Sequence, residues 1–441
     1  MNLLPERAGT SARMPRAQRA VASPVATAGR ALRCSLLALA VLAGAVPVAA
    51  AAEAIAPLRY DQRPETRAFI AELAAEHGFA RRSLAHLFAH ARYQPRIVAA
   101  MSRPVLSPPK WYEYAPQFLS RERIEGGLEF WRANAATLAR AQSEFGVPAE
   151  VIVAIIGVET FYGRNTGGYR VFDALTTLAF DYPRRSDFFR NELKQFLLLA
   201  RDQKVSPLVP RGSYAGASGL PQFMPGSIRA YAVDYDDDGR IDLTGEPADA
   251  IGSVGNYLAR HDWQPGAPVL APARIDPAAS EVVLAKLDGG VSERRPLDAW
   301  ARDGVGADIL PAAPGADPVG LLMLEEAEGP TYWLVFGNWY VLTRYNRSRL
   351  YATAVWQLAQ ALVTARGAAA SAQPDRPAAS PTDPTSATPA NATPANATPA
   401  NATPANATPP DTPPADTTPR DTTPPDPRPA AADPNAGDSA H

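Results

Sequence analysis

The chain has 441 residues, with 43 Lys and Arg against 45 Asp and Glu, a single Cys and 45 Pro. Its length allows about two or three domains. One Cys excludes an intramolecular disulfide framework and any metal cluster held only by cysteines. The net charge of −2 argues against a nucleic-acid partner, because nucleic-acid binders usually carry a basic surplus.

The first 52 residues have the pattern of a secretory signal. Six arginines and an apolar run over 36–46 precede small residues at 48–52. This order predicts a signal peptide that is cleaved after export to the periplasm. The apolar run is too short to favour a spanning helix. Cys34 precedes that run, so no lipid-carrying cysteine stands at the expected position, and Met14 is an alternative start.

Residues 53–366 are predicted to form one mainly helical body. The stretch 268–343 differs, because short β-rich runs such as 281–284 and 332–336 alternate there with Gly and Pro. The fold class is therefore mainly α, of the α+β type, with a small β-rich insertion. Apolar residues at helical spacing predict helices over 64–93, 121–145, 148–160, 186–203, 247–260 and 348–366.

The predicted helix over 148–160 ends in a glutamate. Residues 151–158 are apolar on every side, which predicts a buried helix. Glu159 follows at the negative end of the helix dipole, where partial burial also favours a protonated carboxyl group. Such a group can serve as the general acid of glycosidic cleavage. The alternative is a glutamate at the solvent edge of a core helix.

Several blocks of the sequence resemble the membrane-bound lytic transglycosylase B family, glycoside hydrolase family 103. The resemblance covers roughly residues 60–362. It implies a lysozyme-like core with a helical N-terminal lobe, and it implies Glu159 as the catalytic acid. The matching blocks are G-V-E-T-F-Y-G at 157–163, F-D-Y-P-R-R at 180–185, the Gly- and Ala-rich segment 212–225, D-A-I-G-S-V-G-N-Y at 249–257 and T-R-Y-N at 343–346.

The family resemblance implies a lyase that cleaves the β-1,4 bond between N-acetylmuramic acid (MurNAc) and N-acetylglucosamine (GlcNAc) in peptidoglycan. Ordinary glycosidases use two carboxylates, but no second block offers a convincing partner for Glu159. One residue would then protonate the leaving oxygen and later deprotonate the substrate's 6-hydroxyl group, which gives 1,6-anhydro-MurNAc ends. The alternatives are a lysozyme-type muramidase on the same core and a non-catalytic wall-binding module.

The resemblance also implies residues that contact the substrate. Small residues over 212–225 let the backbone approach a sugar ring, with a tight loop as the alternative, and Ser213 and Gln222 are expected beside the acid. Arg184 and Arg185 are expected to pair with a lactyl or stem-peptide carboxylate, or else to form a surface ion pair. The implied glycan contacts are Tyr114, Tyr257, Tyr345, Asn346 and Tyr351. Each Tyr, taken on its own, would more often belong to the core.

An acidic run that begins at residue 234 has the spacing of an EF-hand calcium loop. Its first, third and fifth positions are Asp and its sixth is Gly239, but Gly245 stands at position 12, where an acidic residue is usual. The resemblance implies closure by Asp249, with Glu246 as the alternative. We expect one structural Ca²⁺ and no catalytic cofactor; a solvated acidic turn is the alternative. The expected ligands are the side chains of Asp234, Asp236, Asp238 and Asp249 and the backbone carbonyl of Arg240.

Residues 367–441 hold 18 of the 45 Pro and repeat the unit N-A-T-P-A between 391 and 406. Such a composition cannot bury enough apolar surface to fold, so it predicts a disordered tail. The expected partners are peptidoglycan glycan strands, with other cell-wall enzymes left open, and the expected state is a monomer.

Overall fold

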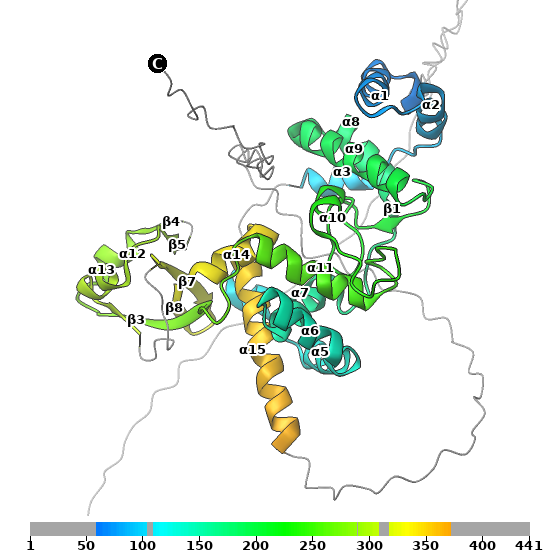
Figure 1. The fold of residues 1–441 in the computed structure, drawn as a ribbon. Coiled ribbons are helices and arrows are strands. Elements are labelled where there is room, and N and C mark those ends of the chain that lie inside the picture. Colours follow the sequence, from blue (N-terminus) through cyan, green and yellow to red (C-terminus); the bar gives the residue numbers. More distant parts are fainter. Residues whose placement is uncertain (1–58, 104–108, 289, 308–316, 372–441) are drawn as a thin grey trace, which may run out of the picture. The chain divides into compact units, whose positions relative to one another are not determined.

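The structure is a computed structural model that describes residues 59–103, 109–288, 290–307 and 317–371 (Figure 1). The predicted signal peptide and nearly all of the predicted tail lie outside these residues. The described chain is mostly helical, with two small antiparallel sheets, which confirms the predicted fold class. Three 3-10 turns accompany the helices: η1 (Tyr60–Gln62), η2 (Ala115–Gln117) and η3 (Pro183–Arg185).

A helical N-terminal lobe surrounds one hydrophobic cluster. The predicted helix over 64–93 is two helices, because Gly78 ends the first in the left-handed conformation that glycine favours. Edge-to-face rings at its centre join Phe69, Phe88 and Phe180. The helix over 171–181 was not predicted. The lobe consists of α1 (Pro64–His77), α2 (Arg81–Ala89), α3 (Pro95–Met101), α8 (Val171–Asp181) and α9 (Ser186–Asp202).

A second hydrophobic cluster encloses the helix that ends near Glu159. Side chains over 151–156 have no exposed surface, which confirms the predicted buried helix. Ser120 begins the neighbouring helix by accepting the N–H of Arg123 at 3.3 Å. The last helix runs past residue 366 to Ser371. The main helices here are α5 (Arg121–Ala133), α6 (Ala135–Phe145), α7 (Ala149–Thr160), α11 (Pro247–Arg260) and α15 (Arg349–Ser371), and the short ones are α4 (Trp111–Tyr114), α10 (Pro225–Tyr231) and α14 (Gly337–Tyr345).

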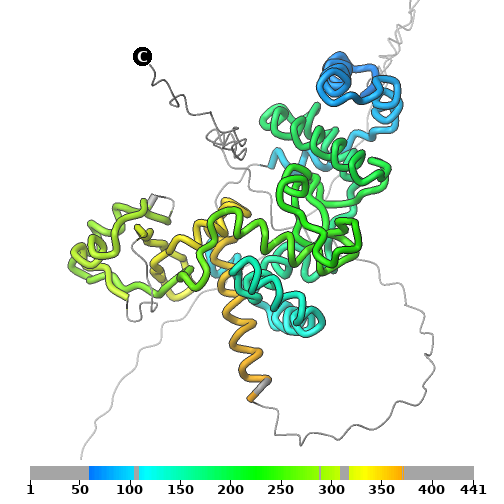
Figure 2. The backbone as a smooth tube through the Cα atoms, in the orientation of Figure 1, coloured from blue at the N-terminus to red at the C-terminus, as the bar shows by residue number. Residues whose placement is uncertain are grey.

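The insertion between α11 and α14 contains a six-stranded antiparallel sheet in the order β4-β5-β7-β8-β3-β6, with its own small core around the fully buried Trp300. Figure 2 follows the chain from α11 into this insertion and back to α14 and α15. The predicted strand at 332–336 is confirmed as part of β8. The strands are β3 (Leu270–Ile275), β4 (Leu287–Asp288), β5 (Val291–Ser292), β6 (Val305–Gly306), β7 (Gly320–Glu326) and β8 (Gly329–Val335).

The strand predicted at 281–284 is wrong, because these residues form α12 (Ser280–Leu284). Asp276 starts the turn: its side chain accepts the N–H of Ala278 at 2.9 Å, and its carbonyl accepts the Ser280 hydroxyl at 3.2 Å. The insertion also contains α13 (Leu297–Arg302), and residues 337–343 at its predicted end belong to α14. The insertion is therefore a mixture of strands and short helices.

Among the described residues, no single helix has the length and apolar character needed to cross a membrane. The pair α6 and α7 meets that test only jointly and is bent by 114°.

Candidate active site

Glu159 is the penultimate residue of α7 and is half-buried. The chain turns sharply after it, because Phe161 and Tyr162 both have left-handed backbone angles, with φ of 52° and 58°. Such angles strain residues other than Gly. Two hydrogen bonds hold the turn: the N–H of Phe161 donates to the Gly157 carbonyl at 3.0 Å, and the N–H of Tyr162 donates to the Ile156 carbonyl at 3.4 Å.

Two arginines flank the Phe161 ring in this turn. The guanidinium carbons of Arg123 and Arg164 each lie 4.6 Å from the ring centre. Arg123 also donates to the Gly157 carbonyl, and burial lowers its pKa. Arg164 pairs with Glu122 at 3.1 Å. The last turn of α7 is thus tied to α5, and a positive charge lies at the negative end of the helix dipole.

Three glycines form a socket for the Tyr162 ring. A methyl group on Gly157 would lie 2.6 Å from the Tyr162 hydroxyl, one on Gly127 would lie closer to it still, and one on Gly126 would lie 3.2 Å from the ring. The ring stacks on Phe130 at 5.8 Å. The Tyr162 ring can therefore pack this closely against α5 and α7 only because both helices have glycine there, and these contacts fix its position.

Three of the predicted tyrosines surround the acid. The Tyr351 hydroxyl donates to Glu159 Oε1 at 2.7 Å, and Tyr345 stacks parallel to Tyr351 at 6.3 Å. Burial and then the charge of Glu159 raise the pKa of Tyr114, Tyr345 and Tyr351 above the ordinary value of a phenol. All three therefore remain protonated, and they can serve as hydrogen-bond donors at neutral pH.

Tyr257 and Asn346 stand beside this group. Tyr257 is buried and its hydroxyl donates to the Arg344 carbonyl at 2.7 Å, so it forms part of the wall behind the site. Its ring centre lies 4.9 Å from that of Tyr345. The side-chain oxygen of Asn346 accepts the N–H of Ser348 at 3.0 Å, just before α15 begins.

The segment 212–225 is a tight loop. Ser213 Oγ accepts the N–H of Ala217 at 3.1 Å, and a side chain at Gly212 would collide with the Ala217 carbonyl. Gln222 has a left-handed φ of 50°, and its amide donates to the Thr166 carbonyl at 3.1 Å. The small residues are therefore required by close backbone approach. Thr160 Oγ1, 3.0 Å from the Leu220 carbonyl, joins this loop to the end of α7.

The two predicted arginines on η3 differ in their surroundings. Arg184 is exposed, whereas the guanidinium group of Arg185 lies 4.1 Å from the Phe188 ring centre. Burial lowers the pKa of Arg185. Neither arginine makes an ion pair with another residue in the part of the chain that the structure describes.

The acidic loop brings its predicted ligands together. Carboxylate oxygens of Asp234, Asp236 and Asp249 lie within 4.8 Å of one another, and so do those of Asp236, Asp238 and Glu246. The fully buried Asp249 accepts the N–H groups of Tyr235 and Asp242 at 2.6 and 2.7 Å. Glu246 Oε2 is buried with no hydrogen-bond partner among the described residues. Calcium prefers carboxylate and carbonyl oxygens, and the Glu246 oxygen without a hydrogen-bond partner is available to it, so this set of residues fits a calcium ion.

Sequence reasoning missed the residues that hold the acid in place. Arg123 lies 34 positions from the Gly157 carbonyl that it binds, and no motif connects the two. The Gly126-Gly127 pair is a signal that could have been used, because two glycines in a helix interior are costly and often mark close packing.

A half-buried carboxyl group at the end of a core helix, beside tyrosines and a tight Gly-rich loop, is typical of enzymes that cleave glycans. The family model described as "Transglycosylase SLT domain" matches residues 61–360. The chain is similar to membrane-bound lytic murein transglycosylase B of Escherichia coli K12, with 38% identity over 318 residues, which cover 70% of this chain and 85% of that protein.

Solved structures agree with this match. Soluble lytic transglycosylase SltB1 of Pseudomonas aeruginosa is 48% identical, with 69% of this chain and all of that one covered and a TM-score of 0.65. E. coli Slt35 in complex with calcium is 38% identical, with 69% and 95% covered and a TM-score of 0.64. P. aeruginosa SltB3 in complex with NAG-anhNAM-pentapeptide is 30% identical, with 68% and 79% covered and a TM-score of 0.59.

The chain belongs to the transglycosylase SLT domain family. Its fold is the lysozyme-like fold of the lytic transglycosylases, as predicted.

Proposed function

We propose that this chain is a peptidoglycan lytic transglycosylase that cleaves the β-1,4 bond between MurNAc and GlcNAc, with Glu159 as its single acid and base. The observation that carries the proposal is the hydrogen bond of 2.7 Å from the buried Tyr351 hydroxyl to Glu159 at the end of a core helix. The family match supports the same reaction.

The proposed reaction proceeds in two proton transfers. Glu159 first gives its proton to the glycosidic oxygen, and the bond from C1 of MurNAc to that oxygen breaks. The Tyr351 hydroxyl stabilises the carboxylate that forms. The carboxylate then takes the proton of the substrate's 6-hydroxyl group, whose oxygen bonds to C1. The products are a 1,6-anhydro-MurNAc end and a free GlcNAc hydroxyl, and no water is consumed.

Mass spectrometry of muropeptides released in heavy-oxygen water tests this reaction. A transglycosylase leaves anhydro ends that are one water lighter than hydrolysed ends and carry no solvent oxygen. The complex of P. aeruginosa SltB3 with NAG-anhNAM-pentapeptide supports the anhydro product. Reducing ends that carry the heavy label would instead establish the lysozyme-type alternative, and release of no fragment would favour a wall-binding module.

We further propose that Ser213, Gln222 and Asn346 bind the sugar hydroxyl and N-acetyl groups beside the acid. Tyr114 supplies an additional donor, and Tyr345, whose hydroxyl donates to the Pro221 carbonyl at 2.5 Å, presents its ring to the sugar. The buried Tyr257 and Tyr351 support the site from behind. The exposed Arg184 and the neighbouring Arg185 pair with a substrate carboxylate. Gln222→Ala should raise KM on glycan strands more than it lowers kcat; an unchanged KM would remove Gln222 from this set.

The acidic loop is proposed to bind one structural Ca²⁺, which the calcium complex of Slt35 supports. Asp234, Asp236 and Asp238 and the Arg240 carbonyl would hold it. Glu246 would close the site, because its buried oxygen has no other partner, while Asp249 organises the loop through two backbone N–H groups. Bound there, calcium would supply charge compensation and rigidity, with no part in proton transfer.

The proposed organisation is a signal peptide over 1–52, a catalytic region over 53–366 and a tail over 367–441. Activity on the wall requires a location outside the cytoplasm, and export to the periplasm follows from the proposed signal. The chain mass of the exported protein tests cleavage of the signal peptide. Its mass in solution tests whether it is a monomer.

A further inference from the structure

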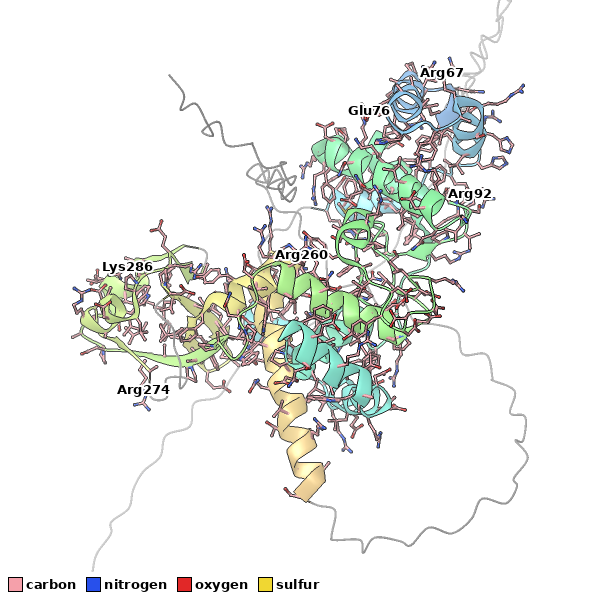
Figure 3. All side chains as sticks on the ribbon, viewed as in Figure 1. Arg67, Glu76, Arg92, Arg260, Arg274 and Lys286 are labelled. Carbon is pink, nitrogen blue, oxygen red and sulfur yellow. The ribbon has the colours of Figure 1, made fainter. Side chains whose placement is uncertain are left out.

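The strongest unexplained feature of the described chain is a basic, carboxylate-free stretch. Residues 78–103 contain five Arg and two His but no Asp or Glu, although the whole chain has a net charge of −2. Arg92 and Arg96, in and just after the loop from α2 to α3, are exposed, and neither makes an ion pair with any described residue. Figure 3 labels Arg92 on the N-terminal lobe.

A hollow of about 400 Å³ lies in this surface, lined by Gln94, Pro95, Arg96, Gly168 and Tyr169. That volume falls in the range of small-ligand sites. Tyr93 at the loop is 45% exposed, which is unusual for so large a ring. The hollow thus combines the Arg96 guanidinium group with the Tyr169 ring, and the exposed Arg92 and Tyr93 adjoin it along the chain.

A carboxylate beside the loop, that of Asp173, is already paired. Asp173 is 3% exposed and accepts two hydrogen bonds from the Arg170 guanidinium group, at 2.7 and 2.8 Å, and the backbone N–H of Arg92 at 3.0 Å. Its charge is therefore balanced by Arg170. The guanidinium groups of Arg92 and Arg96 are thus not neutralised by any described carboxylate, and they can pair with a negatively charged ligand.

The wall of the hollow is joined to the 212–225 loop by strand pairing and hydrogen bonds. In the two-stranded sheet of β1 (Tyr169–Arg170) and β2 (Arg211–Gly212), Tyr169 lies opposite Gly212, directly before Ser213. Exposed Arg211 donates to the Gly168 carbonyl at 2.7 Å. Gln222 binds the Thr166 carbonyl, two residues before Gly168. A ligand attached to a glycan on the 212–225 loop can therefore reach the hollow.

We propose that this hollow binds the peptide stem of peptidoglycan, with Arg92 and Arg96 pairing with its carboxylates and Tyr93 and Tyr169 packing against its aliphatic parts. The proposal rests on the proposed function, and it adds a peptide site separate from Arg184 and Arg185. Guanidinium groups match carboxylates in geometry as well as charge, and peptide stems carry free carboxylates. Continuity with the 212–225 loop favours a wall peptide over an anionic membrane.

Binding of two soluble probes to the full exported chain tests the proposal: GlcNAc-MurNAc-pentapeptide and the same disaccharide without peptide. Arg92→Gln/Arg96→Gln should weaken binding of the peptide probe by about tenfold or more, the range for loss of a charge-assisted hydrogen bond. Its affinity for the bare disaccharide should change by less than about twofold. Arg81→Gln/Arg82→Gln is the matched control, because it removes two exposed charges from the same stretch at the far end of α2.

Equal losses in the two double variants, or no loss in either, would overturn the peptide site. Vesicles of phosphatidylglycerol form a separate arm: if Arg92→Gln/Arg96→Gln loses vesicle binding and keeps peptide binding, the surface is a membrane contact instead. Release of anhydro ends from intact peptidoglycan by the wild type is measured in parallel. Its absence would refute the proposed function, whereas its presence, together with unchanged peptide affinity in the variant, would overturn the peptide site alone.

Discussion

The turn after Glu159 and the acidic loop both contain strained backbone, but different groups stabilise it in each. Both place residues other than Gly in the left-handed region, Phe161 and Tyr162 in the first and Asp237 in the second. In the turn, contacts within the protein hold the strained backbone in place. Arg123 donates to the last turn of α7, and three glycines make room for the Tyr162 ring. In the loop, carboxylates lie together, and burial and neighbouring charges raise the pKa of Glu246.

The difference shows where each region obtains its rigidity. The turn is complete once α5 and α7 have packed, so its shape depends on buried contacts alone. The loop gathers like charges, so the calcium ion proposed above would add the charge compensation that its own residues do not supply. Four predictions test the turn and the loop separately.

Glu159→Gln should have the largest effect, because it removes the transferable proton and leaves the turn intact. General acid–base catalysis contributes about 10²–10⁴-fold, so release of anhydro ends should fall by at least that factor. The melting temperature should stay near that of the wild type. Activity within about fivefold of the wild type, with folding preserved, would reject Glu159 as the acid.

Tyr351→Phe should lower kcat by about 10–100-fold, since a hydrogen bond to a charged group contributes about 1.5–3 kcal/mol. The ring keeps its packing, and only the donor to Glu159 is lost. Tyr112→Phe is the control, because Tyr112 is 39% exposed. Equal kinetics for the two variants would mean that the Tyr351 hydroxyl has no part in the reaction.

Calcium should stabilise the wild type and fail to stabilise Asp234→Asn/Asp238→Asn. If only the native state binds, calcium at 100 times its dissociation constant adds about 2.7 kcal/mol, and thermal melting of metal-stripped protein measures it. Glu246→Gln should weaken the response, while Asp187→Asn, at a side chain that is 98% exposed, should not. An unchanged wild-type midpoint, with no bound metal detected, would leave only a solvated acidic turn.

Gly157→Ala should have the smallest effect, a loss of about 1–2 kcal/mol in unfolding free energy. Overpacking against the Tyr162 hydroxyl at 2.6 Å opposes the gain in helix propensity. Gly126→Ala is the milder comparison, because its contact to the ring is 3.2 Å. Neither variant should alter the calcium response. A calcium response that changes with Gly157 would mean that the turn and the loop are not independent.

The sequence was sufficient for the parts of the fold and site that depend on local pattern. The all-apolar run over 151–158 predicted a buried helix, and Glu159 stands at its end. The spacing of Asp234, Asp236 and Asp238 predicted a cluster of carboxylates that the structure brings together. Each of these features is contained in fewer than about ten consecutive residues.

The features that failed depend on contacts that no local pattern records. The residues at 281–284 fit a strand or a helix equally well, and the turn that Asp276 forms just before them favours the helix. The helix over 171–181 buries Asp173, which its pairing with Arg170 permits. Arg123 reaches Gly157 only after α5 has packed against α7.

The hydrogen bond between Tyr351 and Glu159 joins residues that are 192 positions apart. During synthesis the acid therefore emerges long before the helix that supplies its donor, and long-range contacts of this kind form late. A chain that stops between residues 261 and 350 carries the complete α7 and the complete acidic loop, yet its Glu159 lacks the phenol of Tyr351. The order of the elements along the polypeptide thus delays completion of the proposed site until the last described helix packs.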